Sequence, residues 1–331
     1  MLYRDRQAAI ANTVVLVWTS ASWLASFALM QAPPAALNLL GIVLCTHAMV
    51  LAAYLIHEAA HQTLFARALA NRCAGELMSF IAGSAYASFE RIRHMHIRHH
   101  VDRADVACFD LKDLLRRRPG LRKVLEWLEW LYVPATEILM HLQVIWRPVG
   151  VSSQRAYLPR ATGMLAARLS LLVLLGLWSP KALILYFVAV LLLLHVLNFF
   201  DAFHHTFEQY FVAPDEAVPM RGRDRAYEQA HTYSNLISRR HAWLNLLTLN
   251  FGYHNAHHHR PQVPWYRLPA LHRELYGDRD LCVMPLRELL YTWHRNRVRR
   301  VVEVDYGMPG SGPGRADRFV GAHAVSFLTV V

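Results

Sequence analysis

Histidines gather in four short segments of this sequence, and in three of them they stand three or four residues apart. The segments are HEAAH (57–61), HIRHH (96–100), HNAHH (254–258) and a pair at 204–205. Residues three and four apart lie on one face of a helix, so each of the three groups can direct two or three imidazoles toward one point. Neutral imidazole is a ligand for iron, copper, nickel and zinc. The sequence therefore predicts a metal site.

The number of these histidines exceeds what one metal ion binds. The candidate metal ligands are His57, His61, His96, His99, His100, His205, His254, His257 and His258. A single ion of this kind takes about four to six ligands. The count therefore predicts two metal ions.

Several polar side chains beside the histidine groups are candidates for orienting the ligands. A carboxylate that accepts the spare ring N–H of a ligating histidine fixes the tautomer and the direction of the ring. Glu58, Asp201 and His204 are placed for such a supporting role. Asp102 and Asp105 fit that role and the role of an ordinary solvated carboxylate equally well.

Four apolar runs are long enough to cross a membrane. They cover about residues 10–30, 35–56, 161–178 and 182–200 in a chain that also carries 35 Lys and Arg. A run of about 20 apolar residues spans a hydrocarbon core of about 30 Å. A cleavable signal peptide is the competing interpretation of the first run, but that run is long and no small-residue cleavage site follows it. We expect four transmembrane helices in two hairpins.

The basic residues predict which ends of these helices face the cytoplasm. The turns within the hairpins carry only Lys181, whereas Arg4, Arg6, residues 67–160 and the chain after 221 are rich in arginine. Positive residues favour the cytoplasmic side, so we expect both termini and all histidine groups there, at the inner (plasma) membrane. The net charge of +11 suits anionic lipid headgroups, and no nucleic-acid recognition motif accompanies it.

The expected organisation is an all-α membrane protein with a cytoplasmic helical cap that carries the histidine groups. One domain covers residues 1–306, in which residues 57–160 and 201–306 form the cap. The apolar stretch 73–89 is at the short limit for a span, so we expect it to be re-entrant or interfacial. GMPGSGPGR opens the last segment, 307–331, and predicts a flexible tail.

Two other classes of protein use histidines in this way. HEAAH matches the HExxH motif of zinc metalloproteases, in which Glu58 would be the general base. A zinc protease needs one further protein ligand, however, and leaves the other histidine groups unexplained. A metal transporter would place its ligands at the middle of the membrane, whereas these groups cluster at one end of the spans.

The whole pattern resembles the membrane-bound fatty-acid desaturase family of non-haem diiron enzymes, its bacterial members in particular. The likeness covers roughly residues 35–275 and rests on the series HxxxH, HxxHH, HxxHH with apolar spans before the first group and between the second and third. DAFHHTFE (201–208) is similar to a DAFxHTYE-type segment of the family, which makes His205 the extra ligand and His204 its variable neighbour. Residues 250–272 are similar to the third histidine region of bacterial members. Animal acyl-CoA members have an asparagine where this chain has Asp201, so that position departs from the family pattern.

The resemblance implies a reaction and a set of partners. The nine histidines would hold two iron ions that use O2 to introduce a double bond into the fatty acyl chain of a lipid or an acyl thioester. No catalytic side chain beyond the metal centre is needed. Electrons would come from a separate donor, such as ferredoxin with its NAD(P)H reductase, because no HPGG-type haem-binding segment is present.

Other branches of the same superfamily insert oxygen, as hydroxylases or monooxygenases that act on lipids, alkanes or carotenoids. The histidine groups alone do not separate these branches, and the segments 201–208 and 250–272 favour a desaturase.

His47 and His195 stand within spans, each ten residues from a histidine group, or about 15 Å along a helix. We expect them either to line an acyl tunnel or to form a hydrogen bond between helices.

Overall fold

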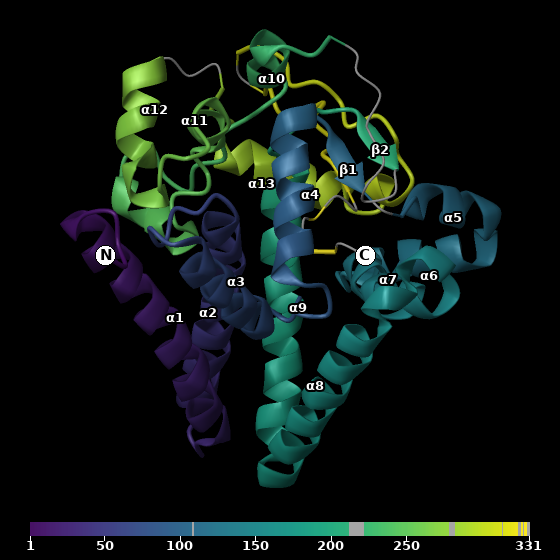
Figure 1. Cartoon of the computed structure of the whole chain (residues 1–331). Coiled ribbons are helices and arrows are strands. Elements are labelled where there is room, and N and C mark those ends of the chain that lie inside the picture. The colour runs from purple at the N-terminus through teal and green to yellow at the C-terminus, as the bar shows by residue number, and fades with distance from the viewer. Residues whose placement is uncertain are drawn as a thin grey trace. The chain divides into compact units, whose positions relative to one another are not determined.

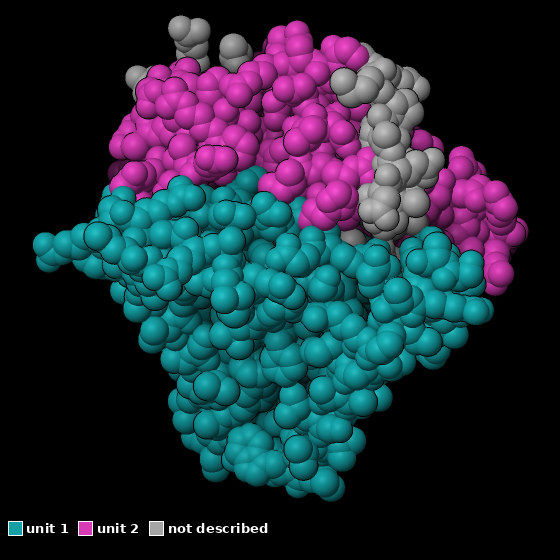
Figure 2. All heavy atoms as spheres, viewed as in Figure 1, with its two compact units in different colours: residues 1–93, 141–196, 328–331 teal, residues 94–140, 197–327 magenta. Residues whose placement is uncertain are grey.

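The computed structural model describes residues 1–331 except Cys108, 212–221, 278–281, Pro313, 324–325, Phe327 and 330–331. The chain divides into two compact units, which Figure 2 shows in different colours. The first unit comprises residues 1–93, 141–196 and 328–331, and the second comprises residues 94–140 and 197–327.

The first unit is built mainly from long helices. They are α1 (Arg6–Gln31), α2 (Ala35–Ala60), α3 (Ala68–Ala82), the start of α4 (Phe89–Asp102), the end of α7 (Ala135–Gly150), the 3-10 helix η1 (Ser152–Tyr157), α8 (Leu158–Trp178) and most of α9 (Pro180–Ala202). Among the described residues, four helical stretches are long and apolar enough to cross a membrane: Arg6–Gln31, Ala35–Ala60, Ser152–Trp178 and Pro180–Ala202. The four spans expected from the apolar runs are therefore confirmed by length and composition.

α1 and α2 run side by side as the first hairpin (Figure 1). The Asn38 side chain donates to the carbonyls of Leu29, Met30 and Ala32, at 3.0, 3.0 and 2.7 Å, so it caps the last turn of α1. Thr46 of α2 donates to the Ala189 carbonyl of α9 at 3.3 Å, which joins this hairpin to the second one within the first unit.

The apolar stretch 73–89 is divided between two helices. α3 ends at Ala82, and Gly83 takes a left-handed conformation with φ of 87° before the turn that leads to α4. α3 has 15 residues, too few to cross a hydrocarbon core of about 30 Å. Gly75 packs directly on Phe89, because a β-carbon at residue 75 would lie 2.2 Å from the Phe89 ring.

The second unit contains short elements. After the end of α4 come β1 (Asp105–Ala107), α5 (Leu111–Arg117), α6 (Pro119–Trp130), the start of α7, the end of α9, β2 (Gln209–Phe211), α10 (Arg225–Ala230), η2 (Ala242–Thr248), α11 (His254–His259), η3 (Trp265–Arg267), α12 (Leu268–Tyr276), α13 (Leu286–Asn296) and η4 (Arg299–Val301). β1 and β2 are parallel, with Asp105 opposite Gln209. This pairing joins the segment after the second histidine group to the segment after His205.

Described residues between 316 and 323 pack into the second unit. Phe319 is fully buried with its ring 5.2 Å from that of Phe203, and its carbonyl accepts a hydrogen bond from Thr292 at 3.0 Å. His323 Nε2 lies 2.6 Å from the Thr136 hydroxyl oxygen. These contacts differ from the flexible tail expected for residues 307–331. Gly307, Gly312 and Gly314 take positive φ angles, and Phe319, Val320 and Ala322 after them are buried.

Candidate metal centre

Three segments of the second unit bring its histidines together. α4 carries His96, His99 and His100, the segment that leaves α9 carries His204 and His205, and α11 carries His254, His257 and His258. Apart from the half-buried His99 and His100, all of these side chains are at least nine-tenths buried. The spacing of three and four residues places the ligands of α4 and α11 on one helix face each, as the sequence indicated.

One group of imidazole nitrogens converges around His205. Its Nε2 atom lies 3.1 Å from Nε2 of His99 and 2.8 Å from Nε2 of His254. A ring nitrogen of His258 falls within 4.8 Å of ring nitrogens of both His99 and His205. Metal–imidazole bonds are about 2.0–2.1 Å long, so two nitrogens bound at right angles lie about 3 Å apart. The spacing of this group fits a single metal ion.

A second group converges around His100. The Nε2 atom of His100 lies 3.2 Å from Nε2 of His96 and 3.2 Å from Nε2 of His257. The two groups are adjacent, because the ring centroids of His100 and His258 are 4.2 Å apart. The second unit therefore contains nitrogen clusters suited to two neighbouring metal ions.

Hydrogen bonds on the far side of two rings orient the nitrogens toward a metal. His258 Nδ1 lies 3.0 Å from Glu228 Oε1, while its Nε2 atom is buried and has no hydrogen-bond partner among the described residues. His99 Nδ1 donates to the Ala104 carbonyl at 2.9 Å, with Asp105 Oδ1 at 3.5 Å. With Nδ1 carrying the proton, the lone pair of Nε2 is available for a metal. The donor set therefore fits metal ions.

Glu228 has a position that the sequence did not reveal. It is 5% exposed in α10, and its other carboxylate oxygen accepts from Arg103 Nε at 3.2 Å. Burial raises the pKa of Glu228, and the hydrogen bond and charge of Arg103 oppose that shift. No motif or periodicity marks this residue, which stands thirty positions before His258, so only the folded chain brings the two together.

Burial keeps four histidines at or beside the nitrogen clusters neutral. Burial lowers the pKa of His99 to about 4 and that of His204 to about 3. Burial, and next the charge of neighbouring histidines, lowers the pKa of His254 and His257 well below the ordinary value. Neutral imidazole is the form that binds metals, so these rings are in the ligating state at physiological pH.

The first unit holds the remaining histidine pair. His57 lies in the last turn of α2 and His61 caps that helix, both are buried, and their ring centroids are 4.8 Å apart. His57 Nδ1 is 3.5 Å from Glu58 Oε1, and Thr63 donates to Glu58 Oε2 at 2.6 Å. Glu58 therefore lies beside a candidate ligand, and its role in orienting that ligand stays a prediction.

The other candidates occupy varied positions. The His204 ring stacks on that of His254, with centroids 4.0 Å apart. Asp102 accepts from Arg98 Nε at 3.1 Å. Burial, together with the charge of Asp201, raises the pKa of Asp105 to about 8. His47 and His195 are half-buried, in α2 and α9 respectively. Their tunnel role stays a prediction.

Comparison with known proteins identifies the family. The sequence model described as "Fatty acid desaturase" matches residues 33–288. A sphingolipid delta(4)-desaturase of Candida albicans (strain SC5314) is 34% identical over 99 residues, which are 29% of this chain and 25% of that relative. The matched segment thus spans about a quarter of the relative's length. Because the family model covers most of this chain, the protein belongs to the fatty acid desaturase family.

Proposed function

We propose that this protein is an O2-dependent diiron desaturase that introduces a double bond into the fatty acyl chain of a lipid or an acyl thioester. The observation that carries the proposal is the pair of adjacent Nε2 clusters around His205 and His100, in a chain of the desaturase family. The family supports a lipid substrate, and the similar protein of Candida albicans is a sphingolipid desaturase.

The ligand set we propose contains all nine candidate histidines. His99, His205, His254 and His258 would hold one iron ion, and His96, His100 and His257 would bind the other. We assign His57 and His61 to the centre as well, on their residue type, their burial and their shared position at the end of α2. An imidazole shell suits iron, although other divalent metals accept the same donors.

The residues around the site have defined tasks in such a reaction. Overall, one O2, two electrons, two protons and a –CH2–CH2– unit become a –CH=CH– unit and two waters. The iron pair, when bound, supplies the oxidising power for removal of hydrogen from an unactivated methylene. Glu228 and the Ala104 carbonyl hold the rings of His258 and His99 in the ligating tautomer. Burial of the histidines keeps bulk water from the centre.

Membrane position and electron supply complete the proposal. The four apolar helices support an integral membrane protein, and the distribution of arginine supports histidine groups and termini on the cytoplasmic side of the plasma membrane. A separate one-electron donor, such as ferredoxin with its NAD(P)H reductase, would supply the electrons. No observation favours the zinc protease, which would use only the HEAAH group and one more ligand.

The lipid profile of a host that expresses the protein tests this function. We expect a new unsaturated acyl species, which should disappear in a His257→Ala, His258→Ala double variant. His241→Ala is the matched control, because His241 is exposed and outside the nitrogen clusters. A hydroxylated or keto product that depends on His257 and His258 would instead assign the protein to the oxygen-inserting branch.

A further inference from the structure

Phe207 lies directly against the metal-binding histidines. Its ring is 2% exposed and stacks on the His205 ring, with centroids 4.2 Å apart and an interplanar angle of 20°. The same ring is 5.5 Å from that of His99. Phe207 therefore contacts two proposed ligands of one ion and carries no group that could bind metal itself.

The stack of rings continues away from the centre. The Tyr227 ring is nearly parallel to that of Phe207, with centroids 6.0 Å apart and an angle of 16°. The His231 ring follows at 4.1 Å from Tyr227 and at 25°. Tyr227 and His231 are half-buried, whereas His205 and Phe207 are buried, so the four rings lead from a buried ligand toward the surface of the second unit.

Hydrogen bonds fix the outer rings of this stack. Asp224 caps α10 by accepting from the Tyr227 backbone N–H at 2.8 Å. At the other end of α10, His231 Nδ1 donates to the Tyr227 carbonyl at 2.9 Å. The positions of both rings are therefore set by the short helix that also carries Glu228.

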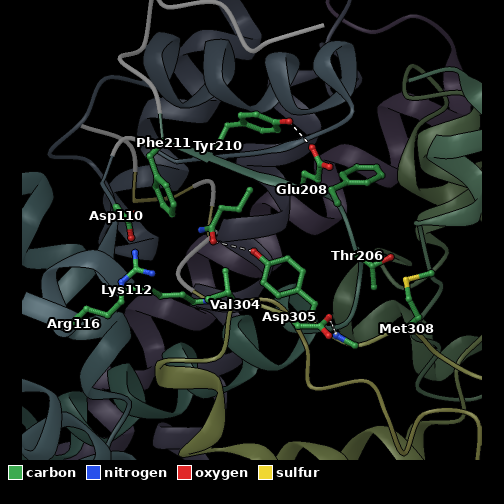
Figure 3. Close-up of a pocket in the computed structure, with 14 residues that line it drawn as sticks. Asp110, Lys112, Arg116, Thr206, Glu208, Tyr210, Phe211, Val304, Asp305 and Met308 are labelled. Atoms are coloured by element: carbon green, nitrogen blue, oxygen red, sulfur yellow. Dashed lines mark hydrogen bonds between the residues drawn. The ribbon is translucent and has the colours of Figure 1, made fainter. Parts of the chain in front are cut away.

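Phe207 also borders an open cavity of about 430 Å³ (Figure 3). Glu208 and Tyr210 line the same cavity, and the Tyr210 hydroxyl donates to the Glu208 carboxylate. Arg223 pairs with Glu208, and its guanidinium lies 5.0 Å from the Tyr210 ring and 5.5 Å from the Tyr227 ring. The Arg223 guanidinium therefore lies near the Tyr227 ring of the stack.

Charged side chains of both signs lie beside the outer rings. Arg225 is exposed, and its guanidinium donates to the His259 carbonyl at 3.5 Å. The Arg223 side chain is only 7% exposed, whereas that of its partner Glu208 is 50% exposed. Asp224, next to Arg225, is exposed as well, so the stacked rings, and not surface charge, indicate an electron route.

We propose that electrons from a one-electron carrier protein enter the metal centre through the stack His231, Tyr227, Phe207, His205. This inference rests on the proposed diiron function. Each transfer oxidises the carrier by one electron and reduces the metal centre by one, without making or breaking a covalent bond, and two transfers serve each O2. Closely spaced π systems shorten the gaps that the electron must cross.

A measurement of electron transfer rate tests the route. It uses the oxidised, iron-loaded full-length protein as the electron acceptor. A reduced plant-type [2Fe–2S] ferredoxin is mixed with it in the absence of O2, and ferredoxin absorbance is followed at increasing ferredoxin concentration. Phe207→Leu should lower the limiting rate several-fold without moving the half-saturating concentration, and Phe207→Tyr should retain the rate. Iron content per chain is measured for each variant.

A second pair of variants keeps the test decisive if Phe207→Leu loses iron. Tyr227 contacts none of the proposed ligand rings that Phe207 touches, so Tyr227→Leu should keep the iron and still lower the limiting rate, whereas Tyr227→Phe should not.

The outcomes separate this inference from the proposed function. Iron-loaded Phe207→Leu or Tyr227→Leu protein that accepts electrons at the unsubstituted rate would overturn the route. Failure of the unsubstituted protein to bind iron would count against the diiron function instead.

Discussion

At the scale of the residue, the spacing of the histidines predicted much of the site. His96 and His100 converge because residues four apart share a helix face, and the same rule applies to His254 and His258. Glu228 could not be found this way, because its contact with His258 depends on how α10 packs beside α11. Phe207 was visible only as part of the DAFHHTFE segment, and its stacking on His205 is a property of the folded chain.

Glu228 gives a prediction about metal affinity. Replacing it with glutamine removes the carboxylate that accepts the His258 Nδ1 proton, and partners of this kind typically contribute about 10–100-fold to metal affinity. We expect Glu228→Gln to weaken binding of the iron ion that His258 would hold by about that factor, measured by competition with a chelator. Glu126→Gln, at a carboxylate that pairs with Arg122, is the control. Equal affinities of the two variants would show that Glu228 does not support the ligand.

At the scale of the element, the sequence predicted the spans well and the short helices poorly. A run of about 20 apolar residues has few alternatives to a membrane helix, so α1, α2, α8 and α9 could be expected. The stretch 73–89 was harder, because its break depends on Gly83 and on how closely α3 and α4 approach. Hydropathy alone contains no information about that approach.

The contact between α3 and α4 gives a prediction about stability. Any β-carbon at residue 75 would overlap the ring of Phe89, the first residue of the helix that carries His96. Gly75→Ala should therefore destabilise the protein by about 1–3 kcal/mol, seen as a lower thermal midpoint in detergent. Gly163 is the matched control, since a β-carbon there meets no atom within 4 Å. If Gly75→Ala melted at or above the temperature of Gly163→Ala, the close packing described here would be wrong.

At the scale of the whole molecule, composition misled most at the C-terminus. The segment GMPGSGPGR is typical of a linker, yet Phe319 and His323 beyond it are buried in the second unit. Their partners Phe203 and Thr136 are more than a hundred residues away in sequence, so no local pattern could indicate the packing. The division of the chain into its two units likewise follows contacts that are distant in sequence.

The buried His323 predicts how stability depends on pH. Burial, and next the charges of Arg300 and Lys112, lowers the pKa of His323 well below its ordinary value. In the unfolded chain the imidazole takes up a proton below about pH 6.5, whereas in the folded protein it stays neutral. The unfolded state then binds more protons, so the free energy of unfolding falls as pH drops, by about 1.4 kcal/mol per pH unit for this group.

A comparison with His323→Gln isolates this effect. Between pH 6.5 and pH 5.5 the unsubstituted protein should lose about 1 kcal/mol more stability than the variant, measured by denaturant unfolding in detergent. Above pH 7.5 the difference between the two proteins should stay constant. Parallel pH profiles throughout this range would mean that His323 is as accessible to protons in the folded protein as in the unfolded one.

The most direct test of the central claim is the fate of the oxygen atoms. Purified, iron-loaded protein is given a lipid or acyl thioester substrate, reduced ferredoxin and ¹⁸O2, and the acyl product is analysed by mass spectrometry. A desaturase yields a product that has lost two hydrogens and carries no ¹⁸O, because both oxygen atoms leave as water. A product that has kept its hydrogen count and gained one ¹⁸O would contradict the account and identify a hydroxylase.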